Sequence, residues 1–194
     1  MENEYFNTGK EKYKNRDFEG AVLDFTYAIE AEPDVADYYY ERGLSYFHLN
    51  KKSLALMDLN EAQKLQPNYP FRYSSRAYIK DSCGDTIGAI EDYKRAIELD
   101  PEDAVSYNNL GLLQEKLGYE EASKKNFSRA DLLAEKSDFL NLISMEDSKK
   151  QESEPTTQEA DTPNKPGVFS TIFKVFTDKK TFREFVTFVK NGFK

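Results

Sequence analysis

Few side chains in this chain have the types that catalysis or metal binding requires. The 194 residues include one histidine, His48, and one cysteine, Cys83, so a His/Cys metal site or a histidine-activated nucleophile lacks partners. Adjacent carboxylates at Glu91-Asp92 and Glu120-Glu121 are the remaining candidates, as a general acid and base. No glycine-rich run has the spacing of a phosphate-binding loop. We therefore expect no catalytic residue, no metal site and no cofactor.

The residue types that do recur are those that pack helices against each other. Small residues repeat every 34 positions in two series, and a bulky residue precedes each alanine of the second series by three positions. Small residues let helix axes approach to about 8–10 Å, and proline starts a helix but cannot continue one. The pattern predicts four helical hairpins. Its members are Gly9, Gly43, Ala77 and Gly111; Ala28, Ala62, Ala96 and Ala130; Phe25, Leu59, Tyr93 and Phe127; and Pro33, Pro67 and Pro101.

This pattern resembles the tetratricopeptide repeat family, whose 34-residue unit is a helix, a turn and a second helix. The resemblance implies an all-α fold, a right-handed superhelical stack of helix-turn-helix repeats over residues 1–135. It also places the two carboxylate pairs at solvated positions, which argues against a catalytic pair. Gly118 and Tyr119 indicate a shifted turn in the fourth repeat. The expected repeats are about 2–35, 36–69, 70–103 and 104–135.

The residues after the repeats divide into three segments by composition. Residues 136–146 are rich in large apolar side chains and are expected to form a capping helix, because a terminal repeat exposes an apolar face. Residues 147–167 contain three prolines and only Ala160 to bury, which predicts a disordered linker. Residues 168–194 have the apolar spacing of two short amphipathic helices, a C-terminal helical tail.

The charge of the chain is unevenly distributed. The formal net charge is −8, and in residues 168–194 six Lys or Arg against two acidic residues give +4, so the other residues sum to −12. An acidic body disfavours nucleic-acid binding. The first residues lack a secretory signal, no apolar run is long enough to span a bilayer, and one cysteine forms no internal disulfide. We expect a cytoplasmic protein.

The resemblance also predicts a binding surface. In the family, the first helices of successive repeats line a concave groove that binds a peptide or a helix. Aromatic side chains there offer large contact area at low entropic cost. Tyr13 and Phe71 fit equally well as packing residues against a neighbouring helix. The expected groove residues are Phe6, Lys10, Tyr13, Lys14, Tyr40, Leu44, Phe47, His48, Tyr78, Asn108 and Leu112, with Phe71, Ser74, Asp81 and Glu115 beside them.

One subtype of the family is not expected here. Chaperone-binding members hold a C-terminal carboxylate with lysine, asparagine and arginine at five positions of the first, third and fifth helices. Of the matching residues only Lys10 has the required charge, and Glu41 would repel the ligand. Arg72 and Arg76 leave a residual positive spot nearby. The five matching residues are Phe6, Lys10, Glu41, Phe71 and Ser75.

The C-terminal segment carries a row of large aromatic side chains that water would not solvate well. Exposed together they would present on the order of 1,000 Å², more than the roughly 300–600 Å² that a soluble monomer tolerates. They could be covered by the protein's own groove, by packing on the fourth repeat, by a partner protein or by a membrane. The tail residues expected to interact are Phe169, Phe173, Phe176, Phe182, Phe185 and Phe188.

The sequence as a whole favours a non-catalytic adaptor. It would bind a protein or peptide in the groove, with the tail as a second interaction or self-docking element. The alternative is a peripheral membrane tether in which basic side chains of the tail meet anionic headgroups. These side chains are Lys174, Lys179, Lys180, Arg183 and Lys190. The acidic body argues against the tether, because the same surface would repel it.

The two interpretations differ in what an isolated peptide of residues 168–194 does with lipid. A membrane tether predicts that the peptide floats with anionic liposomes and stays behind with zwitterionic ones, because its cations meet anionic headgroups. An adaptor tail does not require flotation. Liposome flotation at physiological salt measures this, and a peptide with the six phenylalanines changed to serine serves as the control.

Overall fold

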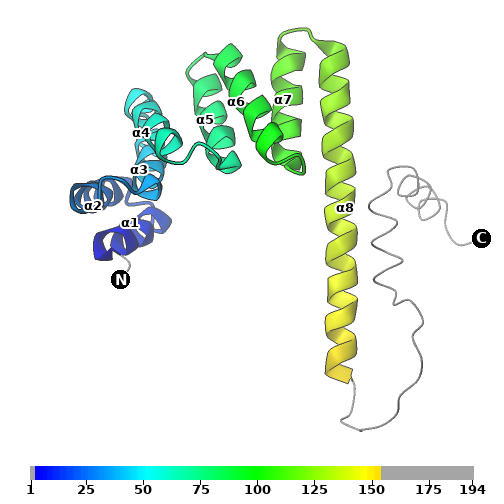
Figure 1. Cartoon of the computed structure of the whole chain (residues 1–194), viewed down its shortest axis with the longest axis horizontal. Coiled ribbons are helices and arrows are strands. Elements are labelled where there is room, and N and C mark those ends of the chain that lie inside the picture. Colours follow the sequence, from blue (N-terminus) through cyan, green and yellow to red (C-terminus); the bar gives the residue numbers. More distant parts are fainter. Residues whose placement is uncertain (1–2, 154–194) are drawn as a thin grey trace, which may run out of the picture. The chain divides into compact units, whose positions relative to one another are not determined.

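The computed structural model describes residues 3–153, which form eight α-helices and no strand (Figure 1). The all-α fold is therefore confirmed for this part of the chain. The latter part of the expected linker and the C-terminal tail lie outside the described residues. The helices are α1 (Glu4–Lys14), α2 (Phe18–Ala31), α3 (Ala36–His48), α4 (Lys52–Leu65), α5 (Pro70–Ser82), α6 (Thr86–Leu99), α7 (Ala104–Lys116) and α8 (Glu120–Ser153).

Local sequence explains where the helices begin and turn. The Asp17 side chain accepts a hydrogen bond from the Gly20 amide at 3.0 Å, and Asp85 accepts one from Gly88 at 2.9 Å, so each carboxylate caps a second helix. Each hairpin turn contains one residue with positive φ, and these residues are also 34 apart: Arg16, Asn50, Gly84 and Gly118. Because Gly118 occupies the same turn position as the others, the expected shift of the fourth turn is wrong.

Glycines in the first helices allow the second helices to approach closely. A methyl group on Gly9 would lie 2.6 Å from the Phe25 ring, and one on Gly111 would lie 2.7 Å from the Phe127 ring. At Gly43 the nearest atoms, in Leu59 and the Ala55 carbonyl group, would be at 3.2 Å. The glycine series and the bulky series are therefore two sides of one contact.

A set of buried ion pairs joins the helices, and the sequence analysis missed it. Both Nε and Nη2 of Arg42 donate hydrogen bonds to the Asp58 carboxylate, at 2.7 and 2.8 Å. The same two atoms of Arg76 donate to the Asp92 carboxylate, at 2.7 Å each. Both aspartates are nearly buried. We call these the Arg–Asp pairs.

The same arginines also bind the preceding hairpin. The Nη1 atom of Arg42 donates to Thr26 Oγ1 at 3.2 Å, and Nη1 of Arg76 donates to Asn60 Oδ1 at 2.9 Å. Since Thr26 and Asn60 lie on α2 and α4, each guanidinium connects three helices. The Arg–Asp pairs therefore hold successive hairpins in a fixed stack.

The end of the chain differs from expectation at α8. Residues 136–146 are not a separate capping helix, because α8 continues without a break from Glu120 to Ser153 and includes the first seven residues of the expected linker. No glycine or proline occurs between Tyr119 and Pro155, so nothing in this stretch ends the helix. The position of Pro33, Pro67 and Pro101 is held here by Glu135, a residue that a helix tolerates.

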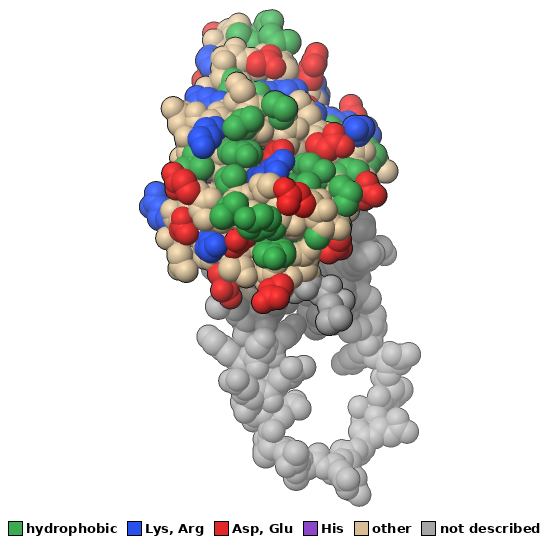
Figure 2. Space-filling view, turned by 90° about the vertical axis from the view of Figure 1, so that its left-hand side faces the viewer, with side chains coloured by type: hydrophobic (Ala, Val, Ile, Leu, Met, Phe, Trp, Pro, Cys, Tyr) green, Lys and Arg blue, Asp and Glu red, His purple; other side chains and the backbone are tan. Residues whose placement is uncertain are grey.

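The outer surface of the first two hairpins shows no continuous apolar patch. Figure 2 views the molecule from the side of α1, α2 and α4, where hydrophobic side chains lie in groups separated by basic and acidic ones. No helix within residues 3–153 is long and apolar enough to cross a membrane.

We expect Arg42→Leu to lower the free energy of unfolding by about 3 kcal/mol, because it leaves Asp58 nearly buried without a cation. The double variant Arg42→Leu/Asp58→Leu should recover much of this loss. Urea denaturation followed by circular dichroism measures both. As a control, Lys64→Ala breaks an exposed pair with Glu61 and should cost less than about 1 kcal/mol. An equal loss in Arg42→Leu and Lys64→Ala would contradict the role of the Arg–Asp pairs.

Candidate peptide-binding surface

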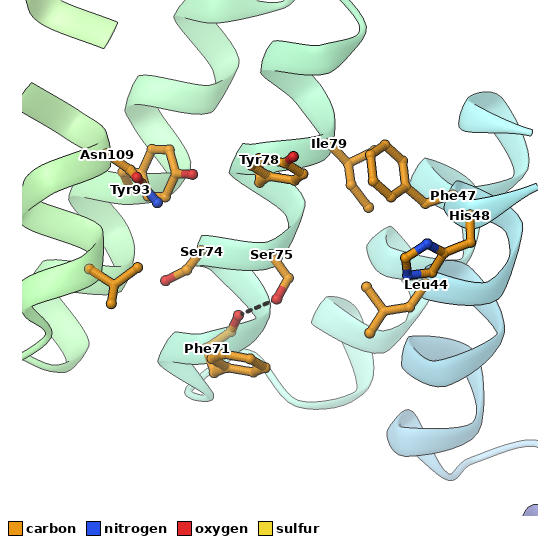
Figure 3. A pocket seen from close by; sticks show the side chains of 11 residues that line it. Leu44, Phe47, His48, Phe71, Ser74, Ser75, Tyr78, Ile79, Tyr93 and Asn109 are labelled. Atoms are coloured by element: carbon orange, nitrogen blue, oxygen red, sulfur yellow. Dashed lines mark hydrogen bonds between the residues drawn. The ribbon is translucent and has the colours of Figure 1, made fainter. Parts of the chain in front are cut away.

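A hollow lies between the first helices of repeats two, three and four. Its volume is about 350 Å³. In Figure 3, Leu44, Phe47 and His48 lie on one side of α5, and Tyr93 and Asn109 lie on the other. The remaining lining residues are Phe71, Ser74, Ser75, Tyr78, Ile79 and Val105.

A second hollow of about 240 Å³ adjoins the first along α5 and α7. The two share Tyr78, Tyr93 and Asn109, so the Tyr78 side chain, 60% exposed, stands between them. We call the two hollows together the groove. The second hollow is lined in addition by Asp81, Leu112, Leu113 and Lys116.

Aromatic and aliphatic side chains give the groove its exposed apolar surface. Phe71 and Val105 are 59% and 66% exposed, on α5 and α7. The rings of Phe47 and Tyr78 meet edge to face, with centroids 5.8 Å apart. Such contacts hold aromatic side chains in place before any ligand arrives, which lowers the entropy lost on binding.

Four polar side chains that line the first hollow are already bonded inside the protein. Ser75 Oγ lies 2.8 Å from the Tyr40 hydroxyl group, and Ser74 Oγ lies 2.6 Å from Ser106 Oγ. Nε2 of His48 lies 2.9 Å from the Tyr13 hydroxyl group. The Asn109 side chain is hydrogen-bonded to Tyr93. The groove therefore offers apolar contact in preference to free hydrogen-bonding groups.

The structure brings together five of the predicted groove residues. Leu44, Phe47, His48 and Tyr78 line the first hollow, and Leu112 lines the second. Phe71, Ser74 and Asp81, which were expected beside them, also line the groove. Phe71 therefore presents its ring to solvent at the groove, whereas Tyr13 packs on Phe18 and His48.

Two predicted groove residues occupy different places. Tyr40 is only 8% exposed and packs among Ala55, Leu59 and Ile79, so it belongs to the core. Asn108 is exposed but lines neither hollow, and its neighbour Asn109 lines both. Ser74, at the same repeat position as Tyr40 and Asn108, does line the first hollow. Periodicity gives the equivalent positions but not the direction of each side chain.

The residues of α1 lie apart from the groove. Phe6 packs against Phe25 and Tyr38 with centroid distances of 5.8 and 4.7 Å, and Lys10 Nζ lies 4.4 Å from the centre of the Phe6 ring. Lys14 is exposed. Glu115 of α7 is exposed and lines neither hollow. The predicted α1 residues Phe6, Lys10, Tyr13 and Lys14 line neither hollow. Of these, only Tyr13 contacts a residue of the groove, His48.

Burial and nearby charges shift several pKa values around the groove. Burial raises the pKa of Tyr40 to about 12 and that of Tyr93 to about 12. Burial, and then the neighbouring Asp37, raise the pKa of the Glu41 carboxyl group. At Asp81 the pKa is lowered, first by the hydrogen bond from Thr86 and then by Lys116. Asp81 and Lys116 pair at 3.0 Å, so these charges compensate each other at the groove.

The positive spot expected from two arginines is not available to a ligand. Arg72 is 1% exposed and is held by the Asp37 carboxylate and by the Ala62 carbonyl oxygen at 3.4 Å. Arg76 belongs to the Arg–Asp pairs. The prediction was wrong because spacing cannot tell an arginine that faces solvent from one that faces an aspartate on another helix.

The described residues hold no cluster of three or more His, Cys, Asp or Glu that could bind a metal ion. Cys83 is exposed at the C-terminal cap of α5, away from both hollows. Of the carboxylates considered as an acid and base, Asp92 is held by Arg76 and Lys80, while Glu91 and the pair Glu120-Glu121 are exposed.

Stacked helical hairpins with a hollow across their first helices define an all-α repeat protein. Sequence models of the tetratricopeptide repeat match residues 6–70 and 104–137, and a TPR repeat model matches residues 82–118. The chain belongs to the tetratricopeptide repeat family. Members of this fold typically serve as non-catalytic interaction modules, so a role in protein interaction follows for this chain.

Curated relatives match over the repeats. The chain is 27% identical over 123 residues to the DnaJ homolog subfamily C member 7 homolog of Dictyostelium discoideum, covering 61% of this chain and 22% of that protein. It is 31% identical over 122 residues to serine/threonine-protein phosphatase 5 of Rattus norvegicus, covering 61% and 23%. The chain thus spans about a fifth to a third of the length of the curated relatives it matches.

Solved structures agree on the fold. MamA superposes with a TM-score of 0.67 at 26% identity, over 69% of this chain and 78% of that one. The first TPR of Spaghetti (RPAP3), bound to the HSP90 peptide SRMEEVD, superposes with a TM-score of 0.57 at 26% identity, over 59% and 90%.

The buried tyrosines predict a loss of stability at alkaline pH. The pKa of Tyr40 is about 12 in the folded chain and about 10 in an unfolded one. Its contribution to the free energy of unfolding is therefore complete below pH 10 and is lost as the pH rises toward 12. In Tyr40→Phe the free energy of unfolding should fall by up to about 2 kcal/mol less over this range. Urea denaturation between pH 8 and 12 measures it, with Tyr78→Phe at the exposed position as the control. Parallel curves for wild type and Tyr40→Phe would contradict the assignment.

Proposed function

We propose that this protein is a non-catalytic adaptor that binds a peptide or helical segment of another protein in the groove. The observation that carries the proposal is the exposed apolar surface of Phe71, Tyr78 and Val105 on neighbouring first helices. Two adjoining hollows on these helices suit a segment that presents apolar side chains at intervals of three or four residues. The peptide-bound Spaghetti (RPAP3) repeat domain supports peptide recognition by this fold.

We also propose that recognition does not depend on a C-terminal carboxylate of the ligand. Among the five positions considered for such a clamp, Lys10 lies against the Phe6 ring, and Glu41 puts an acidic side chain at the third-helix position that the clamp fills with asparagine. Arg72 and Arg76 are engaged by Asp37 and Asp92. A negatively charged terminus would therefore find little compensating charge, whereas an apolar segment finds the groove.

A membrane tether remains the second candidate for the C-terminal tail. It is favoured by the six phenylalanines and the net charge of +4 in residues 168–194. These residues lie outside the described part of the chain, so the tether stays a prediction, as does the cytoplasmic location. The adaptor is preferred because its binding surface consists of described side chains.

The adaptor predicts that the double variant Phe71→Ala/Tyr78→Ala captures its partner at least about tenfold less well, since truncated aromatic anchors typically cost more than 1 kcal/mol each. Tagged wild type and variant are compared by quantitative pull-down from cells of the source organism. The matched control is Met57→Ala/Ile87→Ala, which removes apolar side chains of similar exposure, 65% and 58%, from α4 and α6.

Both variants should retain wild-type helicity, because all four side chains are largely exposed. Tyr40→Ala is unsuitable for this test, since it removes a core side chain. Equal partner capture by wild type, groove variant and control would show that the groove is not the binding site.

A further inference from the structure

The groove favours contact with groups that are apolar and uncharged. Exposed Phe71, Tyr78 and Val105 supply the surface, and four polar side chains of the first hollow already have partners within the protein. Burying an aliphatic or aromatic side chain there removes apolar area from water without breaking those bonds. A charged group would instead lose its hydration without finding a free counter-charge, because Asp81 and Lys116 compensate each other.

We propose that the chain supplies this occupant itself, and that residues 168–194 dock in the groove through their phenylalanines. This inference rests on the proposed function, because it assigns a ligand to the same surface. In the segment Phe182, Phe185 and Phe188 are three residues apart. That spacing suits helix-in-groove recognition, in which apolar side chains at i, i+3 and i+4 enter successive hollows. The ring of Tyr78 then contacts apolar side chains on both of its sides.

Charge complementarity supports the same occupant. Residues 168–194 carry +4, and the other residues sum to −12. Beside the hollows, α3 carries Glu41 and α7 carries the exposed Glu115. Basic side chains between the phenylalanines, such as Arg183, reach acidic groups around the groove while the apolar face is buried. The same body charge opposes docking on an anionic membrane.

The length of the chain beyond Ser153 is sufficient. The 28 residues between Ser153 and Phe182 span up to about 90 Å when extended. The helix α8, with 34 residues, is about 50 Å long. The segment can therefore return along the whole of α8 to the groove. Because it is covalently attached, its effective concentration there is on the order of millimolar, so a weak contact is well populated.

Docking has a consequence for the adaptor. A partner segment must displace residues 168–194 before it occupies the groove, so the two compete. The apparent affinity for a partner is then reduced by the fraction of molecules in the docked state. Deletion of residues 168–194 is expected to raise partner capture several-fold, and the same deletion in the Phe71→Ala/Tyr78→Ala background is expected to change nothing.

A tryptophan reporter tests the docking in the full chain, which contains no tryptophan of its own. In Phe188→Trp we expect emission at short wavelength and low quenching by acrylamide, because the indole is buried. Adding Phe71→Ala/Tyr78→Ala should shift the emission to long wavelength and raise the quenching. Adding Met57→Ala/Ile87→Ala should change neither. Circular dichroism confirms that every variant keeps its helices. A second reporter variant, Phe188→Trp with Phe182→Ser/Phe185→Ser, should also become exposed.

Four results would each overturn the inference. In the first, the reporter is solvent-exposed in the parent chain. In the second, the reporter stays buried in the groove variant, which would place it elsewhere on the protein. Burial is lost on hundredfold dilution, which would mean that a second copy covers it. Emission moves to short wavelength only when phosphatidylserine vesicles are added, which would identify a membrane surface as the occupant.

The same experiments distinguish failure of the docking inference from failure of the proposed function. If the groove variant loses partner capture while the indole of Phe188→Trp is exposed in the parent chain, only the docking inference fails. If the groove variant changes neither partner capture nor reporter emission, the proposed function fails as well.

Discussion

The buried aspartates of the second helices impose the constraint on which much of the structure depends. Asp58 and Asp92 are nearly removed from water, and each requires a cation held at short distance. Arg42 and Arg76 meet this requirement with two hydrogen bonds each and use the remaining nitrogen to bind the preceding hairpin. One interaction therefore fixes the angle within a hairpin and the stacking between hairpins.

The same constraint shapes the binding surface. Arg42 and Arg76 are held by aspartates, and Arg72 is held by Asp37 and a backbone carbonyl group. These arginines are therefore not available to bind an anion. On the face that the hollows occupy, the first helices expose aromatic and aliphatic side chains such as Phe71, Tyr78 and Val105. A stack built from internal ion pairs is therefore compatible with a groove that recognises apolar groups.

Much of the fold could be predicted from the sequence because its contacts are local and repeat. The spacing of Gly9, Phe25 and Ala28 recurs, and a methyl group on Gly9 or Gly111 would collide with the bulky ring that follows it by 16 residues. Residues of the first helices that line the groove, such as Leu44, Phe47 and Tyr78, could be counted from the same register. The continuity of α8 was not predicted, although the absence of glycine and proline after Tyr119 signalled it.

The sequence by itself determined the number of hairpins, the small and bulky residues that join them, and the scarcity of catalytic side chains. Only the tertiary structure decided that Tyr40 is core, that Asn109 replaces Asn108 at the groove, and that Arg72 and Arg76 are engaged. The physical reason is that a period fixes which residues are equivalent along the stack. The direction of each side chain, and the partner it finds there, depend on the rotation of one helix against the next.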